Sequence, residues 1–544
     1  MAQSVRRDSA NADAAEAEDA ARILETGVFG NNEPQPDVGL PEDFEAILGE
    51  LSERDHSTLR AFLSELKMKV HRVRDDQGLT LLHHAVLKLM EGKVKVLLEF
   101  ARDSQFIHEE DIITWINQPT HGEGWTALHY AAFSSNLDAT YCLIENNANI
   151  YALNQNDLSM LHVAAQGDSP SAVYLFANKL KLDINQKDKR GCTPLHWACY
   201  SCSELALQYT LALKPSINIQ DKEGFTPLHL AVRSVGNIES CRPVRSLLIK
   251  GAKTTIRDET GKAPADYIEE APEEMQEELR TLLINRKGGN PLFGGKPAVK
   301  EPKNQACNMI FYYVTFISIF IVKFFQLLSR LEPVLLIVSL VFDILAISLH
   351  LVLTTRDPGY IKNEGIEFLS LLEAFDAQSL CPECRIIRTG RSRHCIICKK
   401  CVERYDHHCP WINNCVGIRN HNIFMAYLFA QAIQLVLMFS EVLFVWIKGA
   451  MLPDGTEGFY QYGPPPAEGI GSLSAHLHAI RRDFLPWLEE PVVFHLTMSI
   501  MLLLCLPFIF ALLQLIYIQI GNFRVGMTTN ERFGRQVYRP NMHP

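Results

Sequence analysis

The sequence lacks an excess of basic residues. Its 544 residues include 52 Lys and Arg but 62 Asp and Glu, so the formal net charge is −10. Proteins that bind nucleic acid usually present a basic surface to it. We therefore expect no nucleic-acid partner.

The chain also lacks the features of a secreted, disulfide-linked protein. Met1 and the six residues after it lead into acidic, Ala-rich sequence without the apolar run of a signal peptide. The fourteen cysteines are clustered and not spread in pairs. We expect the soluble parts to be cytosolic with reduced thiols, and a disulfide framework is the weaker alternative.

Long apolar runs are present, all in the C-terminal half. A chain of this length should divide into several domains. Four stretches reach the ~20 residues that span a bilayer; they are Met309–Leu328, Pro333–Leu353, Ile423–Trp446 and Phe494–Ile520. Four crossings place both chain ends on one side of the membrane.

The distribution of charge between these stretches indicates which side is cytosolic. The segment between the second and third stretches has seven basic side chains between Arg385 and Arg404, whereas the loop from Lys448 to Val493 has three basic and six acidic ones. Basic loops stay on the cytosolic side. We expect the seven cations to meet lipid headgroups or the phosphates of a cofactor, or else to form only a solvated face.

A repeated motif occupies the N-terminal half. Strings of the type Thr-Pro-Leu-His end at His83, His129, His162, His196 and His229, and the last four histidines are 33, 34 and 33 residues apart. A period of 33 is typical of ankyrin repeats. The first interval, 46 residues long, indicates an insertion after the first repeat.

The five repeat histidines invite a metal-binding interpretation, but their regular spacing favours a structural one. Equivalent positions in stacked repeats let each ring tie down turn backbone. The solenoid offers a concave surface for protein partners. Trp125 and Trp197 are candidates for partner contact, with simple packing as the alternative.

Shifts in composition divide the chain into nine segments. These are an acidic disordered tail (1–45), ankyrin repeats (46–285), a linker rich in Gly, Pro and Lys (286–306), transmembrane helices 1 and 2 (307–353), a cysteine-rich zinc domain (354–421), transmembrane helix 3 (422–447), a lumenal loop (448–493), transmembrane helix 4 (494–520) and a cytosolic tail (521–544).

Half of the cysteines fall in one short window that also contains three histidines. Its members are Cys381, Cys384, His394, Cys395, Cys398, Cys401, His407, His408, Cys409 and Cys415. Two closed zinc sites need eight Cys or His ligands. Six cysteines and two histidines supply them, which leaves one cysteine and one histidine without indicating which. A free thiol beside a histidine is a candidate nucleophile.

This window and its continuation Pro410–Phe424 closely resemble the cysteine-rich domain of DHHC-type protein S-acyltransferases, the palmitoyltransferases. Asp357–Gly359 and Thr528–Glu531 match the Asp-Pro-Gly and Thr-Thr-x-Glu motifs of that family. With the repeats in front, the chain from about residue 75 to 540 resembles the ankyrin-repeat branch. The resemblance implies a mainly α fold: an ankyrin-repeat solenoid plus a four-helix transmembrane bundle with a cytosolic two-zinc domain.

The resemblance also assigns the residues of the window. It implies one structural zinc ion on Cys381, Cys384, His394 and Cys401, and a second on Cys395, Cys398, His408 and Cys415. Asp406, His407 and Cys409 stay free. Cys409 is then the nucleophile, His407 its base, and Asp406 the group that orients the imidazole.

The implied reaction moves a long-chain acyl group, expected to be palmitoyl, from acyl-CoA to Cys409 and then to cysteines of client proteins recruited by the repeats. Membrane helices suit such a chain, since each buried CH₂ contributes ~0.8 kcal/mol. Three residues are assigned to the acyl-CoA side of the site. Trp411 is expected to line the membrane boundary, and Thr528 and Thr529 to brace the active-site loop.

Other interpretations stay open at this point. The alternatives to an enzyme are a non-catalytic ankyrin membrane scaffold and a pseudoenzyme that recruits clients without acylating them. We expect contact with membrane lipids in an endomembrane, the Golgi first, with the endoplasmic reticulum or endosomes as alternatives. Asp343 and Glu441 are costly in lipid and should face the interior of the bundle, and the resemblance gives them no role.

Overall fold

The structure is a computed structural model. It describes residues 44–65, 70–90, 92–104, 107–284, 310, 312–314, 317, 333–450 and 491–533. Several expectations therefore lie outside the described residues: nearly all of the acidic tail, the linker, most of the first membrane stretch, nearly all of the lumenal loop and the end of the C-terminal tail.

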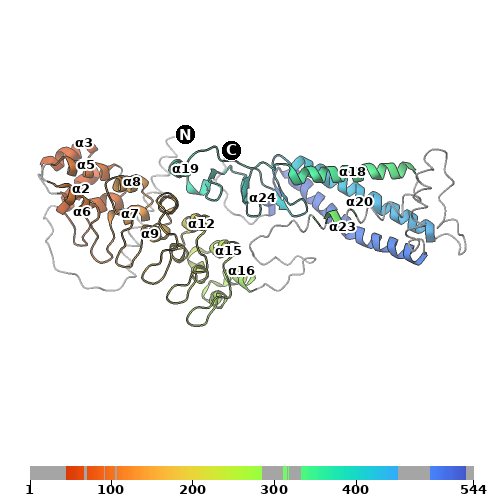
Figure 1. Ribbon diagram of the computed structural model, residues 1–544, viewed down its shortest axis with the longest axis horizontal. Coiled ribbons are helices and arrows are strands. Elements are labelled where there is room, and N and C mark those ends of the chain that lie inside the picture. Colours follow the sequence, from red (N-terminus) through yellow and green to blue (C-terminus); the bar gives the residue numbers. More distant parts are fainter. Residues whose placement is uncertain are drawn as a thin grey trace. The chain divides into compact units, whose positions relative to one another are not determined.

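The chain forms two compact units (Figure 1). One contains residues 1–301 together with 366–383, and the other contains residues 302–365 together with 384–544. A short segment far along the sequence thus belongs to the N-terminal unit.

The first unit is built from short helices. They are α2 (Phe44–Glu53), α3 (His56–Glu65), η1 (Val70–Arg72), α4 (Leu81–Leu87), α5 (Lys93–Asp103), α6 (Glu109–Ile116), α7 (Ala127–Phe133), α8 (Leu137–Glu145), α9 (Met160–Gln166), α10 (Pro170–Tyr174), η2 (Leu175–Lys179), α11 (Pro194–Tyr200), α12 (Glu204–Ala212), α13 (Pro227–Arg233), α14 (Val235–Ile238), α15 (Arg242–Ile249), η3 (Pro264–Glu270) and α16 (Glu273–Leu283), then α19 (Phe368–Ala374) and η5 (Ala377–Ser379).

The repeat histidines stabilise the turns between repeats. In α7 the backbone N–H of Thr126 donates to Nδ1 of His129 at 3.2 Å, and the other ring nitrogen donates to the carbonyl of Leu158 in the next repeat at 3.3 Å. The same arrangement recurs at His162, His196 and His229. The structural interpretation of these histidines therefore agrees with their geometry.

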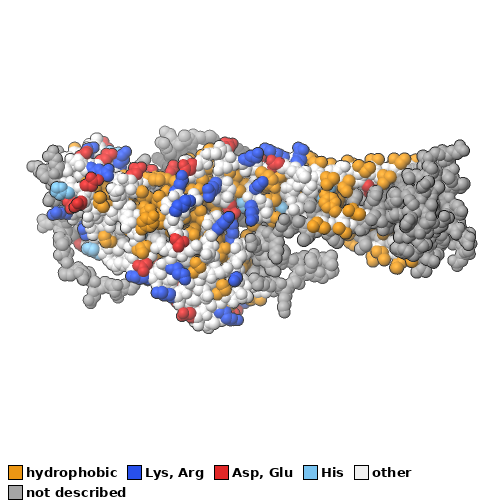
Figure 2. Space-filling model, viewed as in Figure 1, with side chains coloured by type: hydrophobic (Ala, Val, Ile, Leu, Met, Phe, Trp, Pro, Cys, Tyr) orange, Lys and Arg blue, Asp and Glu red, His pale blue; other side chains and the backbone are white. Residues whose placement is uncertain are grey.

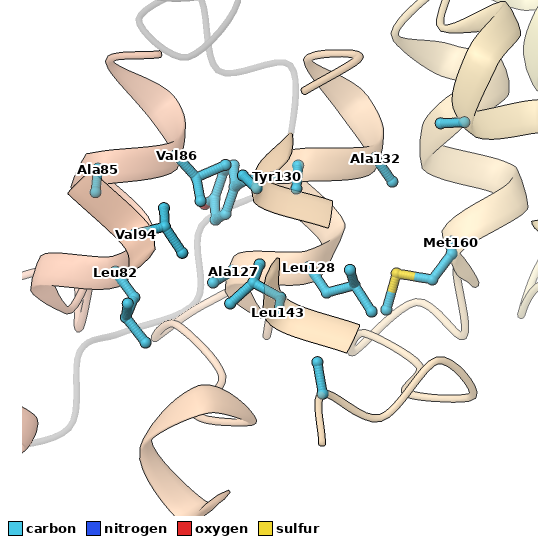
Figure 3. Close-up of a cluster of buried hydrophobic side chains, with 14 of the residues drawn as sticks. Leu82, Ala85, Val86, Val94, Ala127, Leu128, Tyr130, Ala132, Leu143 and Met160 are labelled. Atoms are coloured by element: carbon cyan, nitrogen blue, oxygen red, sulfur yellow. The ribbon is translucent and has the colours of Figure 1, made fainter. Parts of the chain in front are cut away.

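Stacked helices bury apolar side chains in two clusters. Leu82, Val86, Ala127 and Leu128 lie in the first of these clusters, contributed by neighbouring repeats (Figure 3). The long first interval contains helix α6, which is the expected insertion.

The two tryptophans proposed for partner contact are buried instead. Trp125 packs against Tyr130 with ring centroids 4.9 Å apart. The indole N–H of Trp197 donates to Asp188 at 2.9 Å. Both positions favour the packing alternative.

One repeat is a residue longer than its neighbours, and the extra residue lies in its second helix. That helix has nine residues in α8 and in α12. In the intervening repeat α10 and η2 continue one another, with five residues each, and η2 has π-helical hydrogen bonding. A π turn accommodates one residue more than an α turn. This explains the 34-residue interval between His162 and His196.

The second unit contains three long helices and several short strands. The elements are α18 (Pro333–Thr355), α20 (His421–Ala450), α23 (Pro491–Val525) and α24 (Thr529–Phe533), with strands β2 (Ile386–Ile387), β3 (Arg393–Cys395), β4 (Lys400–Val402), β5 (His407–Cys409) and β6 (Asn414–Val416); strand β1 (Leu380–Cys381) belongs to the first unit. Helix α20 packs against both α18 and α23.

Among the described residues, three helices are long and apolar enough to cross a membrane. They span Ile337–Thr355, His421–Ile447 and His495–Val525. Their apolar side chains face outward, as Figure 2 shows for one side of the molecule. Asp343 and Glu441 are buried, as expected for polar groups inside a bundle.

Candidate active site and metal centres

Two β-hairpins bring histidines and cysteines together. In the first, β3 pairs with β4 and places His394 opposite Cys401. In the second, β5 pairs with β6 and places His408 opposite Cys415. Directly opposed residues of an antiparallel pair have side chains on the same face, close to one another. Each hairpin therefore supplies one imidazole and one thiol to a common point.

The two Cys-x2-Cys segments are tight turns. The residue after each second cysteine, Arg385 or Lys399, has a left-handed backbone with φ of 56° or 54°. This bend closes the turn, and the N–H of Lys399 donates to the carbonyl of Cys395 at 2.7 Å. The N–H of Cys398 points at the sulfur of Cys395 at 3.4 Å, which suits a thiolate.

The ligand atoms form two groups of four, Cys381, Cys384, His394 and Cys401, and Cys395, Cys398, His408 and Cys415. Within each group all ligand atoms lie within 4.8 Å of one another. In the second group Nδ1 of His408 lies 3.3 Å from Sγ of Cys398 and 3.6 Å from Sγ of Cys415. Tetrahedral zinc, with bonds of about 2.0–2.3 Å, separates its ligand atoms by roughly 3.5 Å. Both groups therefore fit a zinc ion.

These two zinc-binding clusters contain the same eight residues that the family resemblance implies. The described cysteines are all free thiols. Nothing in the described part of the chain therefore competes with metal binding by cross-linking the ligands.

Strand geometry explains why two adjacent histidines face different partners. Successive side chains in a strand point to opposite faces. His408 faces the second cluster, and His407 and Cys409 lie together on the other face of β5. Their side chains are hydrogen-bonded to each other.

Asp406 completes a chain of three groups. Its carboxylate is 1% exposed and lies 2.7 Å from Nδ1 of His407. This bond leaves the other ring nitrogen of His407 for Cys409. The order carboxylate, imidazole, thiol is the arrangement that generates a thiolate nucleophile.

The groups of this chain shift each other's pKa values. Burial raises the pKa of Cys409. The hydrogen bond and the positive charge of His407 lower this pKa, and together with backbone hydrogen bonds they outweigh burial, so that the net shift is downward. Burial lowers the pKa of His407, but its bonds to Asp406 and Cys409 raise it to about 9. Burial also opposes the charge on Asp406, yet its hydrogen bonds, that of His407 first, bring its pKa to about 2. The site favours a thiolate beside an imidazolium.

Residues from the end of α23 and from α24 hold the carboxylate of Asp406 in place. Thr529 donates its backbone N–H to one oxygen and its hydroxyl to the other, the latter at 3.1 Å. The side-chain amide of Gln519 donates to the second oxygen at 3.0 Å. Gln519 is not among the site residues predicted from the sequence, although an amide inside an apolar stretch is a signal of such a role.

The other residues of the Thr-Thr-x-Glu motif make a different contact. Thr528 donates its N–H to Glu531 at 2.7 Å, and Glu531 accepts two bonds of 2.7 Å from the guanidinium of Arg391. Bidentate Arg–carboxylate pairs are strong and geometrically specific. In the sequence Arg391 is only one of seven cations, because its partner lies 140 residues away.

The Asp-Pro-Gly motif joins helix α18 to the same site. Asp357 accepts the N–H groups of Gly359 and Tyr360, both at 2.8 Å. Gly359 has φ of 110°, and a Cβ there would meet Ile418 at 2.8 Å. Nearby, the amide of Asn414 donates to two carbonyls at the end of α18. The second hairpin is thereby fastened to the helix.

Cys409 also faces an apolar environment. Its side chain is 6% exposed and packs in a cluster with Leu353 of α18, Phe424 and Tyr427 of α20, and Ile516 of α23. Three helices of membrane-spanning character thus surround one thiol. Trp411, two residues further on, is 44% exposed.

Comparison with known proteins agrees with both parts of the chain. Residues 374–536 match the family described as DHHC palmitoyltransferase. Ankyrin repeats match three times, over residues 50–154, 104–188 and 161–258.

Several relatives that match part of this chain are named palmitoyltransferases. Palmitoyltransferase ZDHHC17 of Danio rerio is 30% identical over 34% of this chain and 27% of its own length. Palmitoyltransferase Hip14 of Drosophila melanogaster is 31% identical over 34% of this chain and 26% of its own length, and palmitoyltransferase ZDHHC3 of Rattus norvegicus is 31% identical over 32% of this chain and 60% of its own length. The aligned part thus spans about a quarter of the first two relatives. The chain contains a DHHC palmitoyltransferase domain preceded by ankyrin repeats.

Proposed function

We propose that this protein is a membrane-embedded protein S-acyltransferase that carries a long-chain acyl group, palmitoyl in the first instance, on Cys409. One observation carries the proposal. The Cys409 thiol is bonded to an imidazole that Asp406 orients, and the same thiol packs against side chains of three apolar helices. A reactive thiol in such surroundings suits a lipid-like substrate.

The first half-reaction loads the enzyme. The proton of Cys409 passes to the free ring nitrogen of His407, and the thiolate attacks the thioester carbonyl of a fatty acyl-CoA. A carbon–sulfur bond forms to Cys409 while the bond to coenzyme A breaks. The coenzyme A thiolate takes the proton from His407, so that free coenzyme A leaves.

The second half-reaction transfers the acyl group to a client. A client cysteine loses its proton to His407, attacks the carbonyl of acyl-Cys409 and releases the Cys409 thiolate, which takes the proton back. Each half-reaction exchanges one thioester for another. The free-energy change is therefore small, and no external energy source is needed.

The zinc clusters have a structural role in this proposal. Bound zinc holds the two hairpins, and the hairpins set His407 and Cys409 on the face opposite His408. The acyl chain extends among the membrane helices, because each of its CH₂ groups gains ~0.8 kcal/mol on leaving water. Trp411 lies at the membrane boundary, while Thr529 supports the active site through Asp406.

The proposal also covers how client proteins are recruited and which membrane contains the protein. Ankyrin repeats bind proteins through their exposed surface, so we assign client recruitment to them. The positive-inside rule assigns the zinc domain and both termini to the cytosol. We assign the protein to an endomembrane, with the Golgi as the first candidate. Co-localisation of a tagged chain with Golgi, endoplasmic reticulum and endosome markers tests the compartment.

Incubation of the membrane-embedded protein with a clickable palmitoyl-CoA analogue tests the activity. We expect hydroxylamine-sensitive label on the wild type and none on Cys409→Ser. Equal label on both would show that another residue is the nucleophile. Absence of label from both, with two zinc ions retained per chain, would instead support a non-catalytic scaffold or pseudoenzyme.

A further inference from the structure

Residues 366–383 are far from the repeats in sequence but belong to the same compact unit. Helix α19 lies in this segment, and its apolar residues Phe368, Leu369, Leu371 and Leu372 are buried in the core cluster that the repeats form. A helix of seven residues is too short to be stable alone in water. Its structure therefore depends on packing against the repeats.

Phe368 is the centre of this contact. It is 3% exposed and lies between two tyrosines of consecutive repeats. Its ring is 4.9 Å from that of Tyr174 at an interplanar angle of 73°, and 6.1 Å from that of Tyr209 at 21°. The hydroxyl of Tyr209 also donates to the carbonyl of Ala377 at 3.0 Å. Edge-to-face and stacked rings are favourable geometries for aromatic pairs.

An ion pair lies at each end of the apolar contact. Lys179 pairs with Glu367 before the helix, and Lys250 pairs with Glu383 after it. These side chains are partly exposed, so each pair contributes little to stability. Their positions at both ends of the segment instead specify its direction along the repeats.

The repeat that receives the segment is the one with the extra residue. Tyr174 ends α10, and Lys179 ends the π turn η2 that follows it. Other second helices of the array, such as α8 and α12, have no such turn. π turns occur mostly as local insertions and frequently at functional sites. The irregular repeat and the docked segment are thus two independent observations at one place.

We propose that residues 366–380 are a built-in ligand of the ankyrin array. The segment binds the surface of α10, η2 and α12 as an amphipathic helix binds a groove. Because it is part of the same chain, its effective concentration is high and the surface stays closed to outside partners. Client proteins must then bind elsewhere on the array, or displace the segment.

The docking also has a consequence for the cysteine cluster. Leu380, the last residue of the built-in ligand, is fully buried, and Cys381 follows it directly in the same compact unit. Cys381 is a member of the first zinc-binding cluster. The docked segment thus ends directly before the first ligand of that cluster along the chain.

Amide hydrogen exchange on the full-length chain in lipid nanodiscs tests the proposal. Phe368→Ala removes the central ring, and Phe375→Ala is the matched control, because Phe375 is in the same segment but 45% exposed. We expect Phe368→Ala to raise exchange at least tenfold in both α19 and α10, with α7 and α9 unchanged as evidence of a folded array. Phe375→Ala should match the wild type. Wild-type exchange in Phe368→Ala, or an equal rise in both variants, would overturn the proposal.

A peptide supplied in trans provides a second measurement. A fluorescein-labelled peptide with the sequence of residues 366–380 should bind full-length Phe368→Ala at least tenfold more tightly than the wild type, where the surface is already occupied. The same peptide with Ala in place of Phe368 should bind neither protein. Equal affinity for the two proteins, or no binding to Phe368→Ala, would contradict a ligand-binding surface.

Discussion

The backbone N–H and the hydroxyl of Thr529 both donate to the carboxylate of Asp406, 123 residues earlier in the chain. This relationship joins the short helix after the last membrane-type helix to the hairpin that carries Cys409. It makes the orientation of Asp406, and through it of His407, depend on the C-terminal motif.

Thr529→Ala removes the hydroxyl bond to Asp406 but keeps the backbone one. A hydrogen bond to a charged group is worth about 1.5–3 kcal/mol, and 1.4 kcal/mol is tenfold in rate. We expect the rate of Cys409 acylation to fall about tenfold or more. Thr529→Ser retains the hydroxyl and should restore most of the rate. Equal rates for the Ala and Ser variants would show that the hydroxyl has no positioning role.

Gln519→Ala removes an amide that donates to both Asp406 and Thr529, at 3.0 and 2.9 Å. Because Gln519 is buried, no water replaces it readily, and we expect the acylation rate to fall about tenfold. Gln514→Ala is the control, since Gln514 is exposed on the same helix. The rate of acyl-Cys409 formation measures both variants, and a similar loss in both would point to a general effect on α23.

Arg391→Lys keeps the charge but loses the planar fork that holds Glu531. Lysine cannot form the two parallel bonds of a guanidinium, so the substitution is not conservative here. We expect the midpoint of thermal unfolding to fall, by an amount that corresponds to about 1 kcal/mol. Arg404→Lys, at an exposed position, should leave the midpoint unchanged. An unchanged midpoint in Arg391→Lys would show that the pair is not stabilising.

Metal content distinguishes ligands from the nucleophile. Cys401→Ala removes one of four ligands from the first cluster, so that we expect loss of about one zinc ion and of folding stability. Cys409→Ser should keep two zinc ions per chain. Elemental analysis of the purified variants measures the metal. Fewer than two zinc ions in Cys409→Ser would place Cys409 among the ligands.

The repeat histidines make the solenoid sensitive to acid. Burial, more than any other cause, lowers the pKa of His83, His129 and His196 to about 4, against about 6.5 in an unfolded chain. The unfolded state therefore binds more protons between these values. The contribution of each histidine to the free energy of unfolding is fully present above about pH 6.5. It is lost as the pH falls towards 4, and the loss is at most about 3 kcal/mol per histidine.

Thermal unfolding of the repeats at pH 7 and at pH 5, with amide exchange as the readout, checks this expectation. The midpoint should fall at the lower pH, and His129→Gln should show a smaller fall because one titrating group is gone. A midpoint independent of pH would mean that the folded and unfolded chains bind equal numbers of protons, so that burial does not lower the pKa of these histidines.

The sequence by itself determined the features that depend on neighbours along the chain. A 33-residue period reflects one folded unit repeated, and Cys-x2-Cys spacing reflects a tight turn. Apolar length alone predicted the membrane helices, three of which lie among the described residues, while the first stretch lies mostly outside them. Resemblance then supplied the zinc ligands and the roles of Asp406, His407 and Cys409.

Only the tertiary structure decided which distant groups meet. Strand alternation and hairpin register set His407 apart from His408. Gln519 and Arg391 gained roles because folding brings them to Asp406 and Glu531, which no local pattern signals. Phe368 was an ordinary apolar residue in the sequence until the structure placed it between two tyrosines of the repeats. Such contacts depend on the packing of whole elements, whereas periodicity and ligand spacing depend only on the order of residues along the chain.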